Sequence, residues 1–288
     1  MDYSQKGKYI NFNGENIRSD EFNLNFDNRA FKYGDGLFET LRIANKIPLF
    51  YKDHITRLFY GMKLLNLNFN SETLKHKLEK SITLLLNANK HFAGARIRIT
   101  VYREGKGLYT PENNDFSYII ESTELESSEF ILNTKGIKIG LFKDVKLRYS
   151  EFSRFKTLNS IPYILAGIYK TEKKFDDCLL LNSLNNIVEA ISSNLFLVKD
   201  NALITPSLNE GGIDGITKNI IINIALANKF IIIEDAELHE TDILNADEIF
   251  LTNSISGIIW VGAYKNRRYY NRTAKKFIVE INKLITKE

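Results

Sequence analysis

The chain has 288 residues, and its 44% hydrophobic and 12% aromatic content is enough to bury a core in one large domain or in two ordinary ones. With 39 basic and 35 acidic side chains the net charge is only +4, which argues against a disordered chain and against a nucleic-acid-binding surface. The sequence has no signal-peptide layout, no apolar run near the roughly 20 residues of a membrane span, no second cysteine beside Cys178 and no zinc-type histidine spacing, so we expect a cytoplasmic protein without membrane or metal.

The first half of the sequence predicts a small α+β domain. Residues 8–17 place an Asn-Gly pair between two short strand-like runs, which is the strongest short-range signal for a β-hairpin. Apolar residues at helical spacing predict one helix over 51–67 and a second over 71–90, with Ser71 as the N-cap of the second. Further strands are expected on both sides of a turn at 44–47, at 95–104 and at 116–125.

A polar stretch without periodicity at 123–132 predicts a linker, and a larger α/β domain is expected over 133–288. The expected fold class is therefore α/β, with an α+β domain at 1–122 and the larger domain after the linker. Ligands prefer the interface of two such domains. In the larger domain we expect helices at 158–173 and 215–229 and strands at 136–142, 177–182, 187–200, 202–206 and 248–261.

Three short segments interrupt apolar strands with residues that packing alone does not require. Gly34 and Gly36 in YGDG allow a close backbone approach, although a tight turn alone explains them when they are read in isolation. GIDGIT at 212–217 runs into a helix, so Ile216 and Thr217 offer N–H groups and a hydroxyl to an anion, with a plain helix cap as the alternative. LTNS at 251–254 ends a strand in hydroxyl and amide side chains.

Two charged residues accompany these segments. Glu189 lies in an apolar strand and needs a partner, either a protonated ring nitrogen or one of the many Lys and Arg side chains. Lys156, in RFKTLN, is either one solvated lysine among many or an amine that forms a Schiff base with an aldehyde. Together with Arg57 in HITRL and the helix start at 216–217, these residues supply what pyridoxal phosphate requires: a lysine for the aldehyde, an acid for the ring nitrogen, and an arginine and N–H groups for the phosphate.

The order of these motifs resembles the class IV aminotransferase family, the fold-type IV pyridoxal phosphate enzymes with a D-amino acid aminotransferase-like fold. The motifs FKYGDGLFETLR, HITRL, RFKTLN, EAISSNLF, GIDGIT and EIFLTNS follow one another in family order, and the match runs from residue 10 to residue 261. The resemblance implies pyridoxal 5'-phosphate between two α/β domains, a small-molecule amino substrate and a homodimer. A relative that keeps the fold without catalysis is disfavoured, because Lys156 and Glu189 are both present.

The resemblance also implies a role for each matching residue. Lys156 becomes the Schiff-base lysine and the general base, and Glu189 becomes the partner of the pyridine nitrogen. Asn159 falls near the ring hydroxyl, where branched-chain enzymes have a tyrosine that this sequence lacks. The remaining cofactor-binding residues are Arg57, Ile216, Thr217, Asn253 and Ser254.

Within the family, two positions favour 4-amino-4-deoxychorismate lyase. Thr40 and Asn253 are similar to the lyase, whereas branched-chain transaminases usually have glycine at both places, and the Arg-x-His trap of D-amino acid transaminases is absent after VYRE. The lyase arginine falls at Lys106, which keeps the charge but loses the bidentate fork. We expect a lyase that releases pyruvate and p-aminobenzoate for folate synthesis, with Thr40 serving the leaving ether oxygen, and an amino acid transaminase of branched-chain or D-amino acid type as the alternative. The substrate contacts are expected from Tyr33, Thr40, Arg98, Lys106 and Asn253, with a surface ion pair as the alternative for Arg98.

Overall fold

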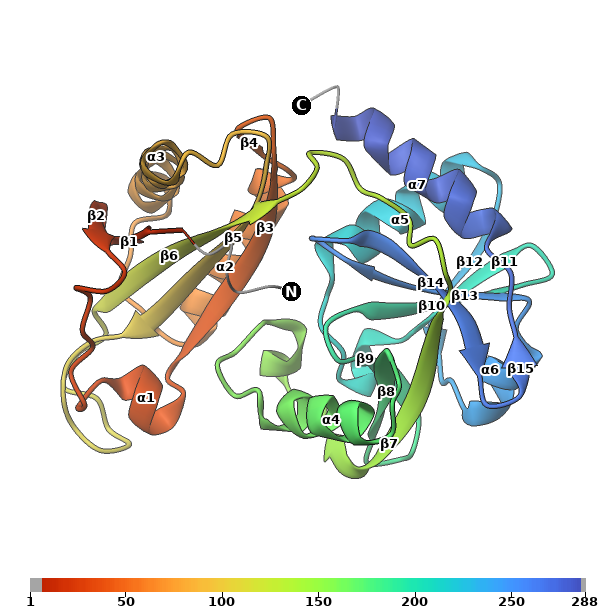
Figure 1. The fold of residues 1–288 in the computed structure, drawn as a ribbon. Helices are drawn as coiled ribbons and strands as arrows, with labels where there is room; N and C mark the ends of the chain where they lie inside the picture. Colours follow the sequence, from red (N-terminus) through yellow and green to blue (C-terminus); the bar gives the residue numbers. More distant parts are fainter. Residues whose placement is uncertain (1–6, 286–288) are drawn as a thin grey trace. The chain divides into compact units, whose positions relative to one another are not determined.

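The structure is a computed structural model that describes residues 7–285, and its chain divides into two compact units (Figure 1). Within the described residues, unit 1 comprises residues 7–129 together with Phe155–Asn159, and unit 2 comprises Phe130–Arg154 and residues 160–285. Both units combine helices with a β-sheet, which confirms the expected mixed α/β class. None of the helices within residues 7–285 is long and apolar enough to cross a membrane.

Unit 1 is built on an antiparallel sheet of six strands in the order β2-β1-β6-β5-β3-β4. Apolar side chains on one face of the sheet, such as Leu41 and Ile99, pack with α2 and α3 into a single core. The opposite face carries Phe38, Thr40 and Arg98. The elements are β1 (Tyr9–Phe12), β2 (Glu15–Arg18), α1 (Arg29–Tyr33), β3 (Gly36–Ala44), β4 (Ile47–Pro48), α2 (Tyr51–Leu64), α3 (Ser71–Asn89), β5 (Gly94–Arg103) and β6 (Phe116–Leu125).

The segment Phe155–Asn159 belongs to unit 1 because it pairs with the outer edge of β3. Thr157 lies opposite Leu37, the Phe38 amide donates to the Lys156 carbonyl at 2.7 Å, and the Leu158 amide donates to the Gly36 carbonyl at 3.1 Å. The same edge of β3 pairs with β4 at its other end. The sequence had assigned Lys156 to the larger domain over 133–288, and the structure differs here because these backbone hydrogen bonds attach the lysine to unit 1.

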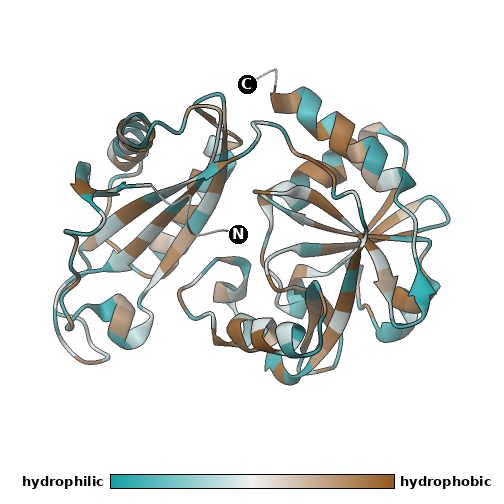
Figure 2. Ribbon diagram, in the orientation of Figure 1, coloured by the Kyte–Doolittle hydropathy of each residue, from teal (hydrophilic) through white to brown (hydrophobic). Residues whose placement is uncertain are grey.

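Unit 2 contains a nine-stranded sheet in the order β12-β11-β10-β13-β14-β7-β8-β9, with β15 paired to β14. The pairs β11–β12, β14–β7 and β7–β8 are parallel and the others are antiparallel. Apolar residues follow the strands of this sheet (Figure 2). The elements are β7 (Ile137–Leu147), α4 (Ile161–Glu172), β8 (Asp177–Asn182), β9 (Ile187–Ala190), β10 (Asn194–Lys199), β11 (Ala202–Pro206), α5 (Ile216–Ala227), β12 (Ile231–Ala236), α6 (Glu240–Asn245), β13 (Glu248–Asn253), β14 (Gly257–Tyr264), β15 (Arg267–Arg268) and α7 (Arg272–Ile285), with short 3-10 helices at Glu151–Arg154 and Leu208–Glu210.

Three local expectations differ from the structure. The N-cap of α3 is Asn70, whose side chain accepts a hydrogen bond from the Thr73 amide, and Ser71 is the first helical residue. The stretch 123–132 overlaps the last residues of β6, which continues to Leu125 because it pairs with β5 along its whole length. The strand expected before the turn at 44–47 begins at Gly36, and the short helix α1 that precedes it was not expected.

Candidate active site

Lys156 lies on the face of the unit 1 sheet that does not pack against α2 and α3. Its side chain is half-buried, and its Nζ lies 5.6 Å from the centroid of the Phe38 ring. The Arg98 guanidinium stacks on the same ring at 3.6 Å, and Thr40 is the direct cross-strand partner of Arg98. The fold therefore brings together Lys156, Thr40 and Arg98, three residues that the sequence had proposed from distant positions.

Arg98 keeps its charge in a partly desolvated place. Burial lowers the pKa of its guanidinium, with Arg96 acting in the same direction and Glu121 in the opposite one. Its Nε donates to the Thr100 hydroxyl at 3.2 Å. A half-buried guanidinium that stacks on an aromatic ring is held in one orientation, which suits it to carboxylate binding.

A buried charge cluster occupies the opposite face of β3. Glu39 accepts from Nε and Nη2 of Arg57 at 2.7 and 2.8 Å, and Nδ1 of His54 lies 2.8 Å from its Oε2. All three side chains are buried. Burial raises the pKa of Glu39, but the Arg57 charge and the hydrogen bonds from His54 and Arg57 outweigh burial and bring the pKa down to about 2.

The buried His54 imidazole has a pKa below its ordinary value. Burial lowers the pKa of its imidazole, and the nearby charges of Arg57 and Lys156 lower it further, against the opposing effect of Glu39. The sequence singled out Arg57 and missed Glu39 and His54. A signal was present, because Glu39 is the only charged residue among the inward-facing positions Leu37, Glu39, Leu41 and Ile43 of its strand.

Two further predicted substrate residues lie elsewhere in unit 1. Tyr33 ends α1, with its ring 5.7 Å from that of Tyr109 and 5.0 Å from the Arg29 guanidinium. Lys106 is exposed in the loop after β5, and its carbonyl accepts from Arg29. Among residues 7–285, no hydrogen bond or ion pair joins the Lys106 side chain to Thr40 or Arg98.

Asn159 lies beside the YGDG turn. A Cβ added at Gly34 would lie 2.8 Å from the Asn159 Oδ1, and Gly34 adopts a positive φ of 63° as the C-cap of α1. The glycine is required by both its conformation and its close approach to Asn159. Asn159 is itself exposed.

In unit 2, Glu189 is buried at the centre of a set of neutral donors. Its Oε1 accepts from the Tyr163 hydroxyl at 2.8 Å, and its Oε2 accepts from the Ile213 amide at 3.1 Å and from Asn194 Nδ2 at 3.3 Å. Burial and the adjacent carboxylate raise the pKa of the Tyr163 phenol far above its usual range. The sequence identified Glu189 and missed Tyr163, its donor from α4.

The N-terminus of α5 has the features of an anion site. Gly215 is the N-cap and supplies no side-chain cap, so the first N–H groups of the helix, including those of Ile216 and Thr217, have no intrahelical acceptor. The Thr217 hydroxyl is buried and has no hydrogen-bond partner in the described part of the chain. A Cβ at Gly215 would lie 1.8 Å from the Asn194 Oδ1, so only glycine allows this approach.

The turn between β13 and β14 is shaped by Asn253. Its Oδ1 accepts from the amides of Ile255 and Ser256 at 2.9 and 2.8 Å, and its Nδ2 donates to the Ser193 hydroxyl at 2.9 Å. The side chain of Asn253 thus holds the turn in which the half-buried Ser254 lies. Ser193 was not singled out from the sequence.

These features fit pyridoxal phosphate. The orphaned Thr217 hydroxyl and the helix N-terminus match a phosphate, and the buried Glu189 matches a protonated ring nitrogen. Lys218 is also buried in the first turn of α5. The N-terminal end of a helix dipole already favours an anion, and a lysine at the same place adds positive charge that a phosphate would neutralise.

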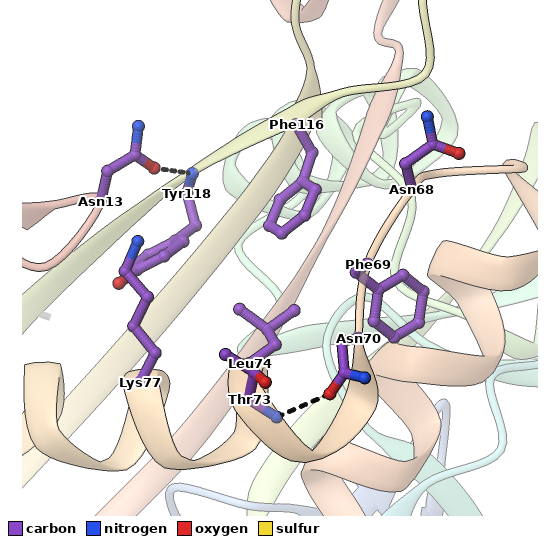
Figure 3. A pocket seen from close by; sticks show the side chains of 9 residues that line it. All are labelled: Asn13, Asn68, Phe69, Asn70, Thr73, Leu74, Lys77, Phe116 and Tyr118. Atoms are coloured by element: carbon purple, nitrogen blue, oxygen red, sulfur yellow. Dashed lines mark hydrogen bonds between the residues drawn. The ribbon is translucent and has the colours of Figure 1, made fainter.

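A separate hollow of about 350 Å³ lies in unit 1 (Figure 3). Two of the asparagine side chains that line it have structural roles: Asn13 accepts a hydrogen bond from the Tyr118 amide, and Asn70 caps α3. It contains none of the residues that the sequence proposed for catalysis or binding. The lining residues are Asn13, Asn68, Phe69, Asn70, Thr73, Leu74, Lys77, Phe116 and Tyr118.

Comparison with known proteins places these features in context. The model of the family described as amino-transferase class IV matches residues 36–264. The chain is 27% identical to a probable branched-chain-amino-acid aminotransferase of Aquifex aeolicus, over 90% of this chain and 85% of that protein. It is 26% identical to the aminodeoxychorismate lyase of Vibrio harveyi, over 80% of this chain and 83% of that protein.

The fold is also similar to that of solved structures. The branched-chain amino acid aminotransferase of Thermobaculum terrenum in its PLP form superposes with a TM-score of 0.83 at 20% identity, covering 98% of this chain and 94% of that one. The expectation of a fold-type IV architecture is confirmed by this likeness together with the family match.

Proposed function

Because the chain belongs to the amino-transferase class IV family and is therefore a pyridoxal-phosphate-dependent enzyme, we propose a specific activity for it, that of 4-amino-4-deoxychorismate lyase. The products are pyruvate and p-aminobenzoate, which places the reaction in folate synthesis. The observation that carries this proposal is the position of Thr40, whose side chain shares one face of the unit 1 sheet with Arg98, Phe38 and Lys156.

When bound, pyridoxal phosphate supplies an aldehyde that condenses with amines and a ring that withdraws electrons from the carbon bearing the substrate nitrogen. Glu189 would accept a hydrogen bond from the ring nitrogen and would keep that nitrogen protonated. The N–H groups of Ile216 and Thr217, the Thr217 hydroxyl and Ser254 would hold the phosphate, and Arg57 would add a guanidinium. Asn159 would serve the ring hydroxyl.

Lys156 acts as the general base on the substrate. Its Nζ takes the proton from the carbon that bears the amino nitrogen and then passes it to Thr40, which loses its own proton to the leaving oxygen, so that the lysine is again a neutral amine when product is released. The Arg98 guanidinium binds a substrate carboxylate, and its stacking on Phe38 fixes where that carboxylate lies relative to Lys156.

Thr40 distinguishes the lyase from a transaminase in this proposal. Its hydroxyl donates a proton to the enolpyruvyl ether oxygen as the bond between that oxygen and the ring carbon breaks, and the departing enol becomes pyruvate. The Thr40 hydroxyl has no side-chain hydrogen bond within residues 7–285, so it is available to the substrate. Tyr33, Lys106 and Asn253 contribute further substrate contacts, with the second amide hydrogen of Asn253 as its available donor.

The test is the release of p-aminobenzoate from 4-amino-4-deoxychorismate by the pyridoxal-phosphate-loaded protein without any 2-oxo acid. We expect p-aminobenzoate and pyruvate in equal amounts, and none from Lys156→Ala. Thr40→Ala should lower turnover by about 10²–10⁴ while the protein keeps its visible cofactor absorption, and Thr40→Ser should restore most of the activity.

An amino acid transaminase is the second candidate, supported by the 27% identity to a probable branched-chain-amino-acid aminotransferase. It predicts product only when an amino donor and a 2-oxo acid are both supplied. Transamination of branched-chain or D-amino acids, with no p-aminobenzoate released, would replace the lyase assignment. A protein that neither binds pyridoxal phosphate nor acquires a visible absorption band would refute both.

A cytoplasmic homodimer completes the proposal. An exposed apolar stripe on α4 supports self-association, because residues at spacings of three and four normally face a core. Its members Ile161, Ile164, Leu165 and Ile168 are 67%, 58%, 37% and 51% exposed.

A further inference from the structure

The side chain of Tyr163, on helix α4, hydrogen-bonds to the Glu189 carboxylate. It lies in the first turn of α4, where Ile161 and Pro162 begin the helix, and its hydroxyl donates to Oε1 of Glu189 at 2.8 Å. The other two donors, the Ile213 amide and Asn194 Nδ2, contact Oε2 at 3.1 and 3.3 Å. The two carboxylate oxygens of Glu189 therefore accept hydrogen bonds from different donors.

The ring of Tyr163 is fixed by packing. It contacts the small apolar core that contains Phe142, Cys178 and Val188, while the neighbouring residues Ile161 and Ile164 on α4 are exposed. The Tyr163 side chain thus turns toward the body of unit 2. A hydroxyl held in this way loses little freedom when it donates, so its hydrogen bond keeps the carboxylate in one rotamer.

Such a donor has a chemical consequence for a buried acid. Burial disfavours the ionised carboxylate, whereas each hydrogen bond received favours it. A hydrogen bond to a charged group is stronger than one between neutral groups, and its loss leaves the buried carboxylate partly unsatisfied. The Tyr163 phenol is an acceptable donor because its own ionisation is suppressed by burial and by the adjacent carboxylate.

We propose that Tyr163 is a positioning residue that holds Glu189 ionised and oriented, so that this carboxylate retains its affinity for a protonated ring nitrogen. The hydrogen bonds from Tyr163, Ile213 and Asn194 to Glu189 all come from residues of unit 2. Its use toward a ring nitrogen rests on the proposed function.

The test is the Tyr163→Phe variant, which removes only the hydroxyl and keeps the ring in the core. Tyr169→Phe is the matched control, since Tyr169 is on the same helix, packs against Phe142 and Phe175, and has no side-chain hydrogen bond within residues 7–285. Glutamate labelled with ¹³C at the side-chain carboxyl is followed by NMR in the cofactor-free protein, with Glu189→Gln identifying the Glu189 resonance.

We expect Tyr163→Phe to raise the pKa of Glu189 by about 1 to 2 units relative to wild type, and Tyr169→Phe to leave it unchanged. In protein loaded with pyridoxal phosphate labelled with ¹⁵N in the ring, Tyr163→Phe should move the nitrogen resonance toward that of neutral pyridine. Turnover should fall about tenfold. Melting temperatures of both variants show whether the fold is retained.

The outcomes separate this inference from the proposed function. An unchanged Glu189 titration in a folded Tyr163→Phe protein, or an equal change in Tyr169→Phe, would overturn the role of Tyr163. A raised Glu189 pKa supports it, even if the ring nitrogen resonance stays the same. That last result would instead count against Glu189 as the partner of the ring nitrogen.

Discussion

Glu39 shows how much a single buried charge can constrain a site. A carboxylate and a guanidinium buried together seldom stabilise a fold more than an apolar pair of similar size, because both lose their hydration. Glu39 and Arg57 nevertheless lie between β3 and α2, at positions where apolar side chains would normally pack. The edge of β3 that hydrogen-bonds to Lys156 is close to Glu39 in sequence. Burying both charges costs hydration free energy. This cost is explained if Arg57 is required as a cation in a fixed orientation, because Glu39 accepts hydrogen bonds from two of its nitrogens.

The low pKa of Glu39 makes the stability of unit 1 dependent on pH. The folded carboxylate has a pKa of about 2 against an ordinary value of 4.5, so its contribution is complete above pH 4.5 and is lost as the pH falls toward 2. Wild type should therefore lose up to about 3 kcal/mol from this group between pH 6 and pH 2, and Glu39→Gln should lack this loss. Urea unfolding at several pH values measures the difference.

A matched control for this prediction is Glu72→Gln, since Glu72 is an exposed residue of α3. It should follow wild type within about 0.5 kcal/mol at each pH. If Glu39→Gln showed the same acid dependence as wild type, the carboxylate would not be ionised through its contacts with Arg57 and His54.

At the level of elements, two neighbouring residues, Asn70 and Ser71, are candidates for the N-cap of α3. The Asn70 side chain accepts from the Thr73 amide at 2.9 Å, whereas Ser71 is already helical. Asn70→Ala should cost about 1 kcal/mol of unfolding free energy because one helix donor loses its acceptor. Ser71→Ala should change stability by a few tenths at most, and denaturant titration compares the two. If Ser71→Ala lowered the free energy of unfolding more than Asn70→Ala, Ser71 would be the N-cap, as the sequence had suggested.

Most of the strands and three of the longer helices were predictable because their signals are local. The hairpin at β1 and β2 follows from Asn13-Gly14, and α2, α3 and α5 follow from helical spacing of apolar residues. Helix α4 was expected from residue 158 but begins at Ile161, because the preceding residues pair with β3 instead. The five-residue α1 is too short for a period to appear.

One large element was missed although its pattern was present. Helix α7 places Ala274, Phe277, Ile278 and Ile281 on one buried face at helical spacing, yet no helix was expected there. Strand β12 and helix α6 were also not anticipated.

Among site residues, the ones found and the ones missed differ in a physical way. Lys156, Glu189 and Thr217 stand out because a motif surrounds each of them. Glu39 with His54, and Tyr163 with Glu189, are contacts across 15 and 26 residues of chain, so no local pattern joins the partners. Only the packing of a helix on a strand reveals them.

At the level of the whole molecule, the apolar stripe of α4 predicts how the protein associates. If α4 contributes to the interface of a homodimer, Ile164→Glu should weaken the dimer, because a charge would be buried against an apolar surface. Sedimentation velocity over a range of concentrations measures the association. Lys173→Glu, at the exposed end of the same helix, is the charge-changing control and should leave the dimer intact. A wild-type protein that remains monomeric at every concentration tested would contradict the proposed homodimer.

The attachment of Phe155–Asn159 to β3 also changes what a broken chain would do. Within residues 7–285 the backbone passes from one unit to the other at 129–130, 154–155 and 159–160. A protease that cuts once within 130–136 would separate residues up to 129 from the rest of the chain and leave the other two passages intact. The C-terminal fragment would still supply the five-residue segment whose Lys156 carbonyl and Leu158 amide hydrogen-bond to the edge of β3. The two fragments of the nicked protein are thus expected to stay associated and to complement each other. The C-terminal fragment, which lacks β3, carries Lys156 and the segment that pairs with the edge of β3.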